Sequence, residues 1–263
     1  MSRFPTRSAA ALAALLLAAV PARAEDAPRP HVVLVLVDDA GYSDFGAHGR
    51  EIATPNIDAL AASGARFSNF HASPMCAPSR AMLLTGLDSH TAGVANLPET
   101  VPPEHAGRPG YLGHLAENVV TIASILRGAG YHTYMTGKWH LGHTPGALPD
   151  GQGFERSLAL DATGGDNWEQ RPYLPIYEDA DWFEDGAPVR LPESFYSSEL
   201  LVDRMIEYID GAKGDGRPFF AYLPFLAIHI PIQAPREFVA RYEGVYDAGW
   251  AAQRERRHRG AIS

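Results

Sequence analysis

Residues 31–39 read His-Val-Val-Leu-Val-Leu-Val-Asp-Asp, and the class of fold can be inferred from them. The run from Val32 to Val37 is apolar without interruption, which is typical of a strand buried on both faces in the middle of a parallel sheet. Helices cover both faces of such sheets, and ligands bind at the carboxyl ends of the strands, where Asp38 and Asp39 stand. Two adjacent carboxylates form either a solvated acidic turn or a site for Ca²⁺ or Mg²⁺. The segment predicts an α/β protein with a polar site at this end of the strand.

Two later segments repeat this arrangement of a strand followed by polar side chains. Residues 131–136 predict a strand that leads to Lys138 and His140, and residues 219–223 predict a strand that leads to His229. Lys138 and His140 are two residues apart and share one side of an extended chain, where a cation and an imidazole suit a doubly charged oxyanion. His229 lies among apolar residues and could equally be a core histidine with one satisfied hydrogen bond.

The segment 73–86 contains Cys76, the only cysteine among 263 residues. It predicts a turn that enters a helix, with Pro78 in the first turn and Gly86 as a left-handed C-cap. At a helix N-terminus the free N–H groups favour an anion, and Arg80 adds a permanent positive charge. Cys76 is either a small buried residue before an ordinary helix or a nucleophilic thiol with a lowered pKa.

The remaining periodic segments complete an alternating pattern of helices and strands. We expect helices over residues 55–64 and 198–209, and a second strand over residues 65–70 that leads into the Cys76 turn. Residues 91–115 are rich in Gly, Pro and His and predict a long surface excursion. Residues 141–192 have little periodicity and predict a long, partly ordered excursion that helps to shape the rim of the pocket.

The first 24 residues have the pattern of a secretory signal peptide. Arg3 and Arg7 form a basic region, residues 9–20 are apolar, and Ala22-Arg23-Ala24 resembles a cleavage site. The apolar run is too short for a stable membrane anchor, which is the alternative interpretation. The sequence therefore predicts a periplasmic or secreted protein.

Beyond this leader the chain is acidic. It keeps 19 of the 22 Lys and Arg residues, because three lie in the leader, against 31 Asp and Glu residues. This balance argues against nucleic acid as a partner. With one cysteine the chain forms no internal disulfide, and an exported lone thiol is open to oxidation. Because an exported thiol is open to oxidation, this favours a role in which Cys76 is either protected or chemically converted.

Five short motifs follow one another along the chain: residues 38–46 (DDAGYSDFG), 54–60 (TPNIDAL), 76–80 (CAPSR), 83–86 (LLTG) and 130–140 (GYHTYMTGKWH). In this order they resemble the type I sulfatases, the arylsulfatase family of the alkaline phosphatase-like superfamily. The resemblance covers about residues 31–250 and implies a mixed, mostly parallel sheet sandwiched by helices. The match at His229 is weaker, because the family often has a second histidine where this chain has Ile232 or Gln233.

The resemblance implies that Cys76 is oxidised to formylglycine (3-oxoalanine) by a formylglycine-generating, sulfatase-maturating enzyme. Asp38, Asp39 and an oxygen of the modified Cys76 would bind one metal ion, Ca²⁺ in preference to Mg²⁺. The metal and Arg80 would stabilise the alkoxide that attacks the sulfur of a small-molecule sulfate ester.

The other implied roles concern the substrate. Lys138 would neutralise a sulfate oxygen. His229 would contact the substrate and protonate the departing alcohol or phenol, and His140 would help to remove a proton from the remaining hydroxyl so that sulfate leaves.

The chain departs from the family after His229. Sulfatases of this kind have a further Asp-Asn pair of metal ligands and a second lysine there, whereas this chain has no Asn, no Lys and only Asp247. We therefore expect residues 25–263 to be the N-terminal portion of a catalytic domain whose C-terminal part is missing, with little or no activity and an uncovered sheet edge. A phosphonate or phosphate monoester hydrolase of the same superfamily and a non-catalytic remnant are the alternatives.

Overall fold

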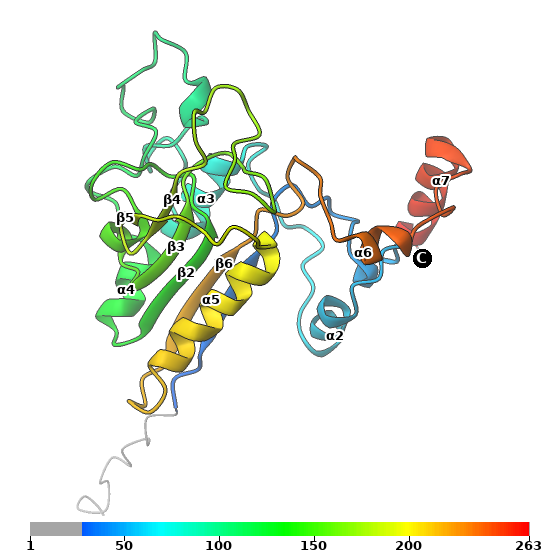
Figure 1. Cartoon of the computed structure of the whole chain (residues 1–263), viewed down its shortest axis with the longest axis horizontal. Coiled ribbons are helices and arrows are strands. Elements are labelled where there is room, and N and C mark those ends of the chain that lie inside the picture. The colour runs from blue at the N-terminus through cyan, green and yellow to red at the C-terminus, as the bar shows by residue number, and fades with distance from the viewer. Residues whose placement is uncertain (1–27, 263) are drawn as a thin grey trace, which may run out of the picture. The chain divides into compact units, whose positions relative to one another are not determined.

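The computed structural model describes residues 28–262, and of these the chain from Val32 onward forms one unit (Figure 1). The predicted signal peptide lies outside the described residues. Within them, no helix has both the length and the apolar character needed to cross a membrane.

A mixed sheet organises this unit. Its strand order is β1-β6-β2-β3-β4-β5, with parallel pairing from β1 to β3 and antiparallel pairing of β4 and β5. The mostly parallel sheet predicted from the sequence is therefore confirmed. The strands are β1 (Val32–Leu36), β2 (His132–Lys138), β3 (Arg156–Leu160), β4 (Trp182–Glu184), β5 (Ala187–Pro188) and β6 (Phe219–Pro224).

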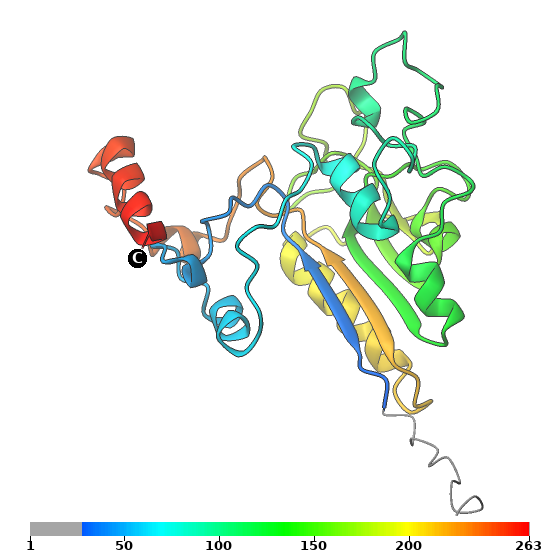
Figure 2. The ribbon, with the colours of Figure 1, turned by 180° about the vertical axis from the view of Figure 1, so that it is seen from behind.

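Helices cover both faces of the sheet. Figure 1 shows α5 in front of β6, and Figure 2 shows α3 and α4 on the opposite side. Side chains alternate along β6, so Tyr222 joins the core under α3 and α4 while Ala221 joins the core under α5. The helices are α2 (Pro55–Ser63), α3 (Cys76–Thr85), α4 (Ile122–Gly128), α5 (Ser197–Gly211), α6 (Arg236–Ala240) and α7 (Gly249–Ile262), with short 3₁₀ turns η1 (Gly46–His48), η2 (Pro98–Thr100) and η3 (Pro149–Gln152).

The strand predicted for the middle of the sheet lies at its edge in the described part of the chain. β1 pairs with β6, and Val33 and Val35 remain 59% and 52% exposed. Both valines lie in register with β6 residues of the core under α5, which contacts β2, β6 and β3. The continuous apolar run thus has one covered face and one partly uncovered face.

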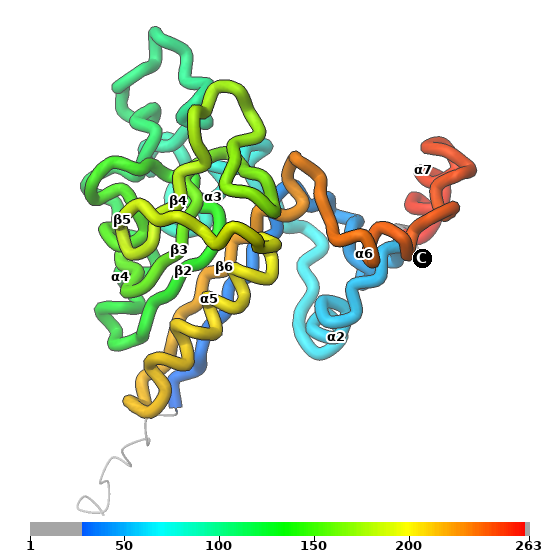
Figure 3. Tube along the Cα trace, viewed as in Figure 1, coloured from blue at the N-terminus to red at the C-terminus, as the bar shows by residue number. Residues whose placement is uncertain are grey.

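One expectation for the connecting segments is wrong. Residues 65–70 form no strand, and Phe67 and Phe70 are exposed on the open path between α2 and α3 that Figure 3 traces. Residues 141–192, predicted as a partly ordered excursion, contain β3, β4 and β5, whose positions the sequence did not indicate. β3 is short and stands between loops rich in Gly and Pro, so periodicity alone did not reveal it.

Candidate active site

The predicted site residues lie at the carboxyl ends of the parallel strands β1, β2 and β6, with Lys138 as the last residue of β2, and Cys76 begins α3. Met75 is the N-cap of α3, and Gly86 ends the helix with φ 70°, as the sequence predicts. The loops after β1 and β6 are joined by two backbone hydrogen bonds, from Asp38 N–H to Ala227 O and from Ile228 N–H to Asp38 O, both 2.9 Å long. Strand order and these bonds bring residues far apart in the sequence to one edge of the sheet.

Asp38 lies between two buried cations. Lys138 Nζ donates to Asp38 Oδ2 at 2.5 Å, and Arg80 Nη2 lies 3.1 Å from Asp38 Oδ1. Arg80 also donates to the Lys138 carbonyl oxygen at 2.7 Å, which fixes the three groups together. Burial alone would raise the pKa of Asp38, but the charges of Arg80 and Lys138 outweigh it and hold that pKa below its usual value. One net positive charge remains, which suits an anionic ligand.

Cys76 belongs to a chain of hydrogen-bonding side chains. Its Sγ lies 3.3 Å from His140 Nδ1, and His140 Nε2 lies 2.9 Å from Glu99 Oε1. Burial alone would raise the pKa of Cys76, but the hydrogen bond with His140 and the charge of Lys138 lower it to about 7. Burial also opposes a charge on His140, yet hydrogen bonds with Cys76 and Glu99 raise the pKa of its ring. The arrangement can hold and move a proton beside position 76.

His229 stands at the rim rather than in contact with Cys76. Its Nδ1–H donates to the Ile230 carbonyl oxygen at 2.7 Å, and its Nε2 lies 3.7 Å from Asp39 Oδ2. The Asp39 side chain is 59% exposed, in contrast to the buried Asp38, and its backbone has φ 63°.

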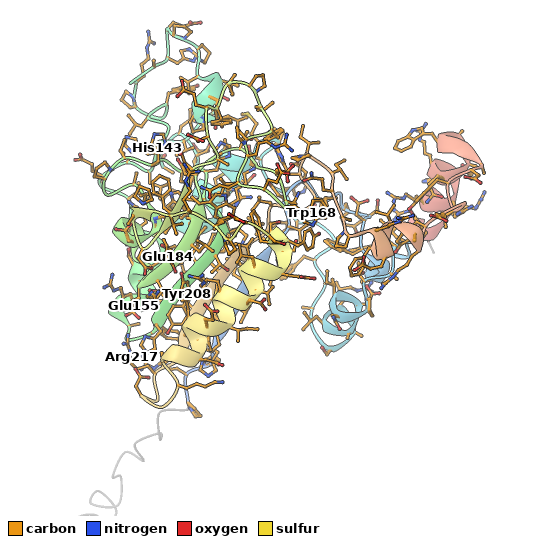
Figure 4. All side chains as sticks on the ribbon, viewed as in Figure 1. His143, Glu155, Trp168, Glu184, Tyr208 and Arg217 are labelled. Carbon is orange, nitrogen blue, oxygen red and sulfur yellow. The ribbon has the colours of Figure 1, made fainter. Side chains whose placement is uncertain are left out.

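A cavity of about 190 Å³ unites four of the predicted residues, with Asp38, Asp39, Cys76 and Arg80 in its wall. Lys138 and His140 contact this set directly, through Asp38 and Cys76. A neighbouring cavity of about 470 Å³ has His140, Glu99 and His143 in its wall, and His143 Nδ1 lies 2.9 Å from Asp161. Figure 4 labels His143.

The predicted metal ligands are only partly assembled. Within residues 28–260, no three His, Cys, Asp or Glu side chains are grouped as a metal ion requires. Both oxygens of Asp38 face cations, Asp39 points to His229, and Cys76 faces His140. The described side chains alone therefore do not fit a complete Ca²⁺ site, which takes six to eight oxygen ligands.

Two residues of the site were missed from the sequence. Glu99 lies in the segment predicted as a surface excursion and Tyr177 in the segment predicted to shape the pocket rim, and the Tyr177 hydroxyl donates to Glu99. No local pattern marks Glu99, since its partner His140 is 41 residues further along the chain.

Comparison with known proteins identifies the family of the chain. The family model Sulfatase matches residues 30–261. The arylsulfatase of Klebsiella aerogenes is 39% identical over 250 residues, which cover 93% of this chain and 53% of that enzyme. The crystal structure of Ps i-CgsB in complex with k-i-k-neocarrahexaose is 29% identical with a TM-score of 0.70, covering 89% of this chain and 52% of that chain.

A more distant structure shows the fold alone. It is a protein of the alkaline phosphatase superfamily from Vibrio parahaemolyticus, with 19% identity and a TM-score of 0.50, and the match covers 90% of this chain and 49% of that chain. The chain thus spans about half the length of the relatives it matches. From its motifs, its sheet and these matches, the chain belongs to the sulfatase family.

Proposed function

We propose that the protein is a sulfuric ester hydrolase that cleaves small-molecule sulfate monoesters, as arylsulfatases do. One observation supports this function above the others. Cys76 at the N-terminus of α3 shares a cavity with the buried Asp38–Arg80 pair, to which Lys138 adds a second cation. A nucleophile beside two buried cations suits attack on a sulfate group.

We assign the nucleophile to Cys76 in its formylglycine form, made by a sulfatase-maturating enzyme. This form supplies an oxygen nucleophile in place of sulfur. His140 Nδ1, now 3.3 Å from Sγ, is placed to accept a proton from the group at position 76. Arg80 and Lys138 attract the sulfate oxygens, and their buried positions strengthen that attraction.

We assign His229 to the leaving group. Its Nε2 is directed toward Asp39 at the rim of the cavity, while Nδ1 is occupied by the Ile230 carbonyl oxygen. Nε2 is therefore the atom from which His229 would protonate the departing alcohol or phenol.

Asp38 and Asp39 are the two carboxylates we assign to a divalent cation, Ca²⁺ in preference to Mg²⁺. Both line the wall of the Cys76 cavity. The proton transfers assigned to His140 and His229 require only the side chains described. We also propose that the chain is exported, on the basis of residues 1–24.

The function can be tested by producing the chain together with a sulfatase-maturating enzyme and measuring hydrolysis of 4-nitrophenyl sulfate and of a phenyl phosphonate monoester. We expect slow sulfate ester hydrolysis that is lost in Cys76→Ala and in protein made without the maturating enzyme. Equal hydrolysis by the wild type and Cys76→Ala would overturn the proposal. Preference for the phosphonate ester would assign the site to the sister class of hydrolases.

A further inference from the structure

We propose that Glu99 is a positioning residue that holds His140 in the orientation required at Cys76, and that Tyr177 in turn fixes Glu99. The inference rests on the proposed function, because that function gives His140 its role at position 76. The family signatures in the sequence include His140 but neither of these two residues.

The contact between Glu99 and His140 uses both carboxylate oxygens. His140 Nε2 lies 2.9 Å from Oε1 and 3.2 Å from Oε2, and the Glu99 side chain is only 13% exposed. The carboxylate accepts the Nε2 proton, which leaves Nδ1 of the neutral ring as an acceptor. That nitrogen faces Cys76 Sγ. Glu99 thus selects both the tautomer and the direction of the ring.

Glu99 is itself held from its other side. The Tyr177 hydroxyl donates to Glu99 Oε1 and accepts the backbone N–H of Thr163 at 3.2 Å. A continuous series of hydrogen bonds therefore runs from the backbone after β3, through Tyr177 and Glu99, to His140 and Cys76. Such a series restricts each member because rotating one side chain breaks two bonds.

The backbone of His140 adds to this argument. His140 has φ 58°, in the left-handed region that non-glycine residues seldom occupy, and its side chain is 2% exposed. A residue keeps such a conformation when its surroundings over-determine it. Among the described residues, the hydrogen bonds of the imidazole with Glu99 and Cys76 hold the His140 side chain in this position.

Other histidine–carboxylate pairs in the described chain lack a nucleophile on the second nitrogen. His132 lies between Glu155 and Asp215, with Nδ1 2.7 Å from Glu155 and Nε2 2.6 Å from Asp215. Glu155 is partly buried, as Glu99 is, but it lies against a histidine that does not contact Cys76. Glu155→Gln is therefore a matched control for Glu99→Gln.

The single cysteine makes the test specific. Unmodified chain, produced without a maturating enzyme, is treated with iodoacetamide at pH 7, and mass spectrometry follows alkylation of the Cys76 peptide. We expect Glu99→Ala to slow alkylation by roughly fivefold to tenfold, because the freed imidazole no longer keeps Nδ1 beside Sγ to accept the thiol proton during the reaction. Glu99→Gln should recover part of the rate, since its amide oxygen still accepts the Nε2 proton, and Tyr177→Phe should lose a smaller part. Glu155→Gln should react at the wild-type rate.

If Glu99→Ala is alkylated at or above the wild-type rate, the inference is wrong. Removing a side chain with a merely structural role would loosen the cavity and make Cys76 more accessible to iodoacetamide, which raises the alkylation rate. If Glu99→Ala does not fold, Glu99→Gln and Tyr177→Phe decide the question: unchanged rates in both contradict it. Alkylation does not depend on ester hydrolysis. If sulfate ester hydrolysis is absent but the alkylation rates follow this pattern, the proposed function fails while the positioning role of Glu99 stands.

Discussion

Asp38 is the residue whose charge matters most to the site, because it lies between Arg80 and Lys138 with only 5% of its surface exposed. Removing one member of a buried ion pair leaves an uncompensated charge. We expect Asp38→Asn to lower the free energy of unfolding by about 3–5 kcal/mol, measured by urea denaturation. The adjacent, exposed Asp39 provides the control, and Asp39→Asn should change stability by no more than about 0.5 kcal/mol. Equal urea midpoints for the two variants would contradict this description of Asp38.

Glu99 should make the stability of the fold depend on pH. Burial alone would raise its pKa, but the hydrogen bond and charge of His140 and the hydrogen bond from Tyr177 lower it from 4.5 to about 2. A carboxyl whose pKa is lowered by folding stabilises the protein above the unfolded value and loses that contribution as the pH falls through the folded value.

The urea midpoint of the wild type should therefore fall more steeply between pH 4.5 and about 2 than that of Glu99→Gln. If the urea midpoints of the two proteins fall in parallel with pH, the contact with His140 does not lower the pKa of Glu99 on folding.

Individual site residues could be predicted from the sequence where they neighbour one another. Arg80 follows Cys76 by one helical turn, and Lys138 precedes His140 by two residues. Glu99 could not be predicted, because its role depends on a contact with His140 across 41 residues. Loops that are distant in the sequence come together around the site, and no short sequence pattern marks such contacts.

At the scale of elements, Gly137 is needed where β2 passes β6. Gly137 has φ 138°, and a Cβ at this position would lie 1.9 Å from the Pro224 carbonyl oxygen. Any side chain here pushes β2 from β6 and shifts Lys138, the next residue.

We expect Gly137→Ala to cost about 3 kcal/mol or more in thermal or urea unfolding, because the clash is with backbone and comes in addition to the strained φ. Gly86→Ala is the control, since Gly86 has φ 70° with nothing within 4 Å of the added Cβ. It should cost only about 1 kcal/mol. Similar losses in the two variants would contradict a special role for the β2–β6 contact.

The elements that carry long apolar or periodic patterns could be predicted, and the short ones could not. β2 and β6 are mostly buried, β1 is an uninterrupted apolar run, and α5 has Leu201, Met205 and Tyr208 on one face. β3 has five residues and forms a strand because β2 and β4 pair with it on its two sides. Residues 65–70 have a strand-like composition, but they belong to no sheet in the described part of the chain and stay irregular.

At the scale of the whole molecule, the uncovered side of β1 is the feature that affects behaviour in solution. Val33 and Val35 are more than half exposed on a strand at the edge of the described sheet. Exposed apolar edge strands pair with other copies unless charges prevent it. We expect Val33→Lys and Val35→Lys to reduce self-association in light-scattering measurements.

Leu60→Lys is the matched control for these variants, because Leu60 is a 72% exposed apolar residue on α2, away from the sheet. It should leave self-association unchanged. Equal effects of the α2 and β1 variants would show that general surface hydrophobicity, and not the strand edge, causes association.

The most direct measurement is mass spectrometry of the Cys76 peptide after co-production with a formylglycine-generating enzyme, in cells where a control arylsulfatase is converted. We expect an aldehyde in place of the thiol at position 76, detectable by its reaction with a hydrazide. An unmodified thiol at Cys76, alongside complete conversion of the control enzyme, would contradict the assignment of Cys76 as the precursor of the sulfatase nucleophile.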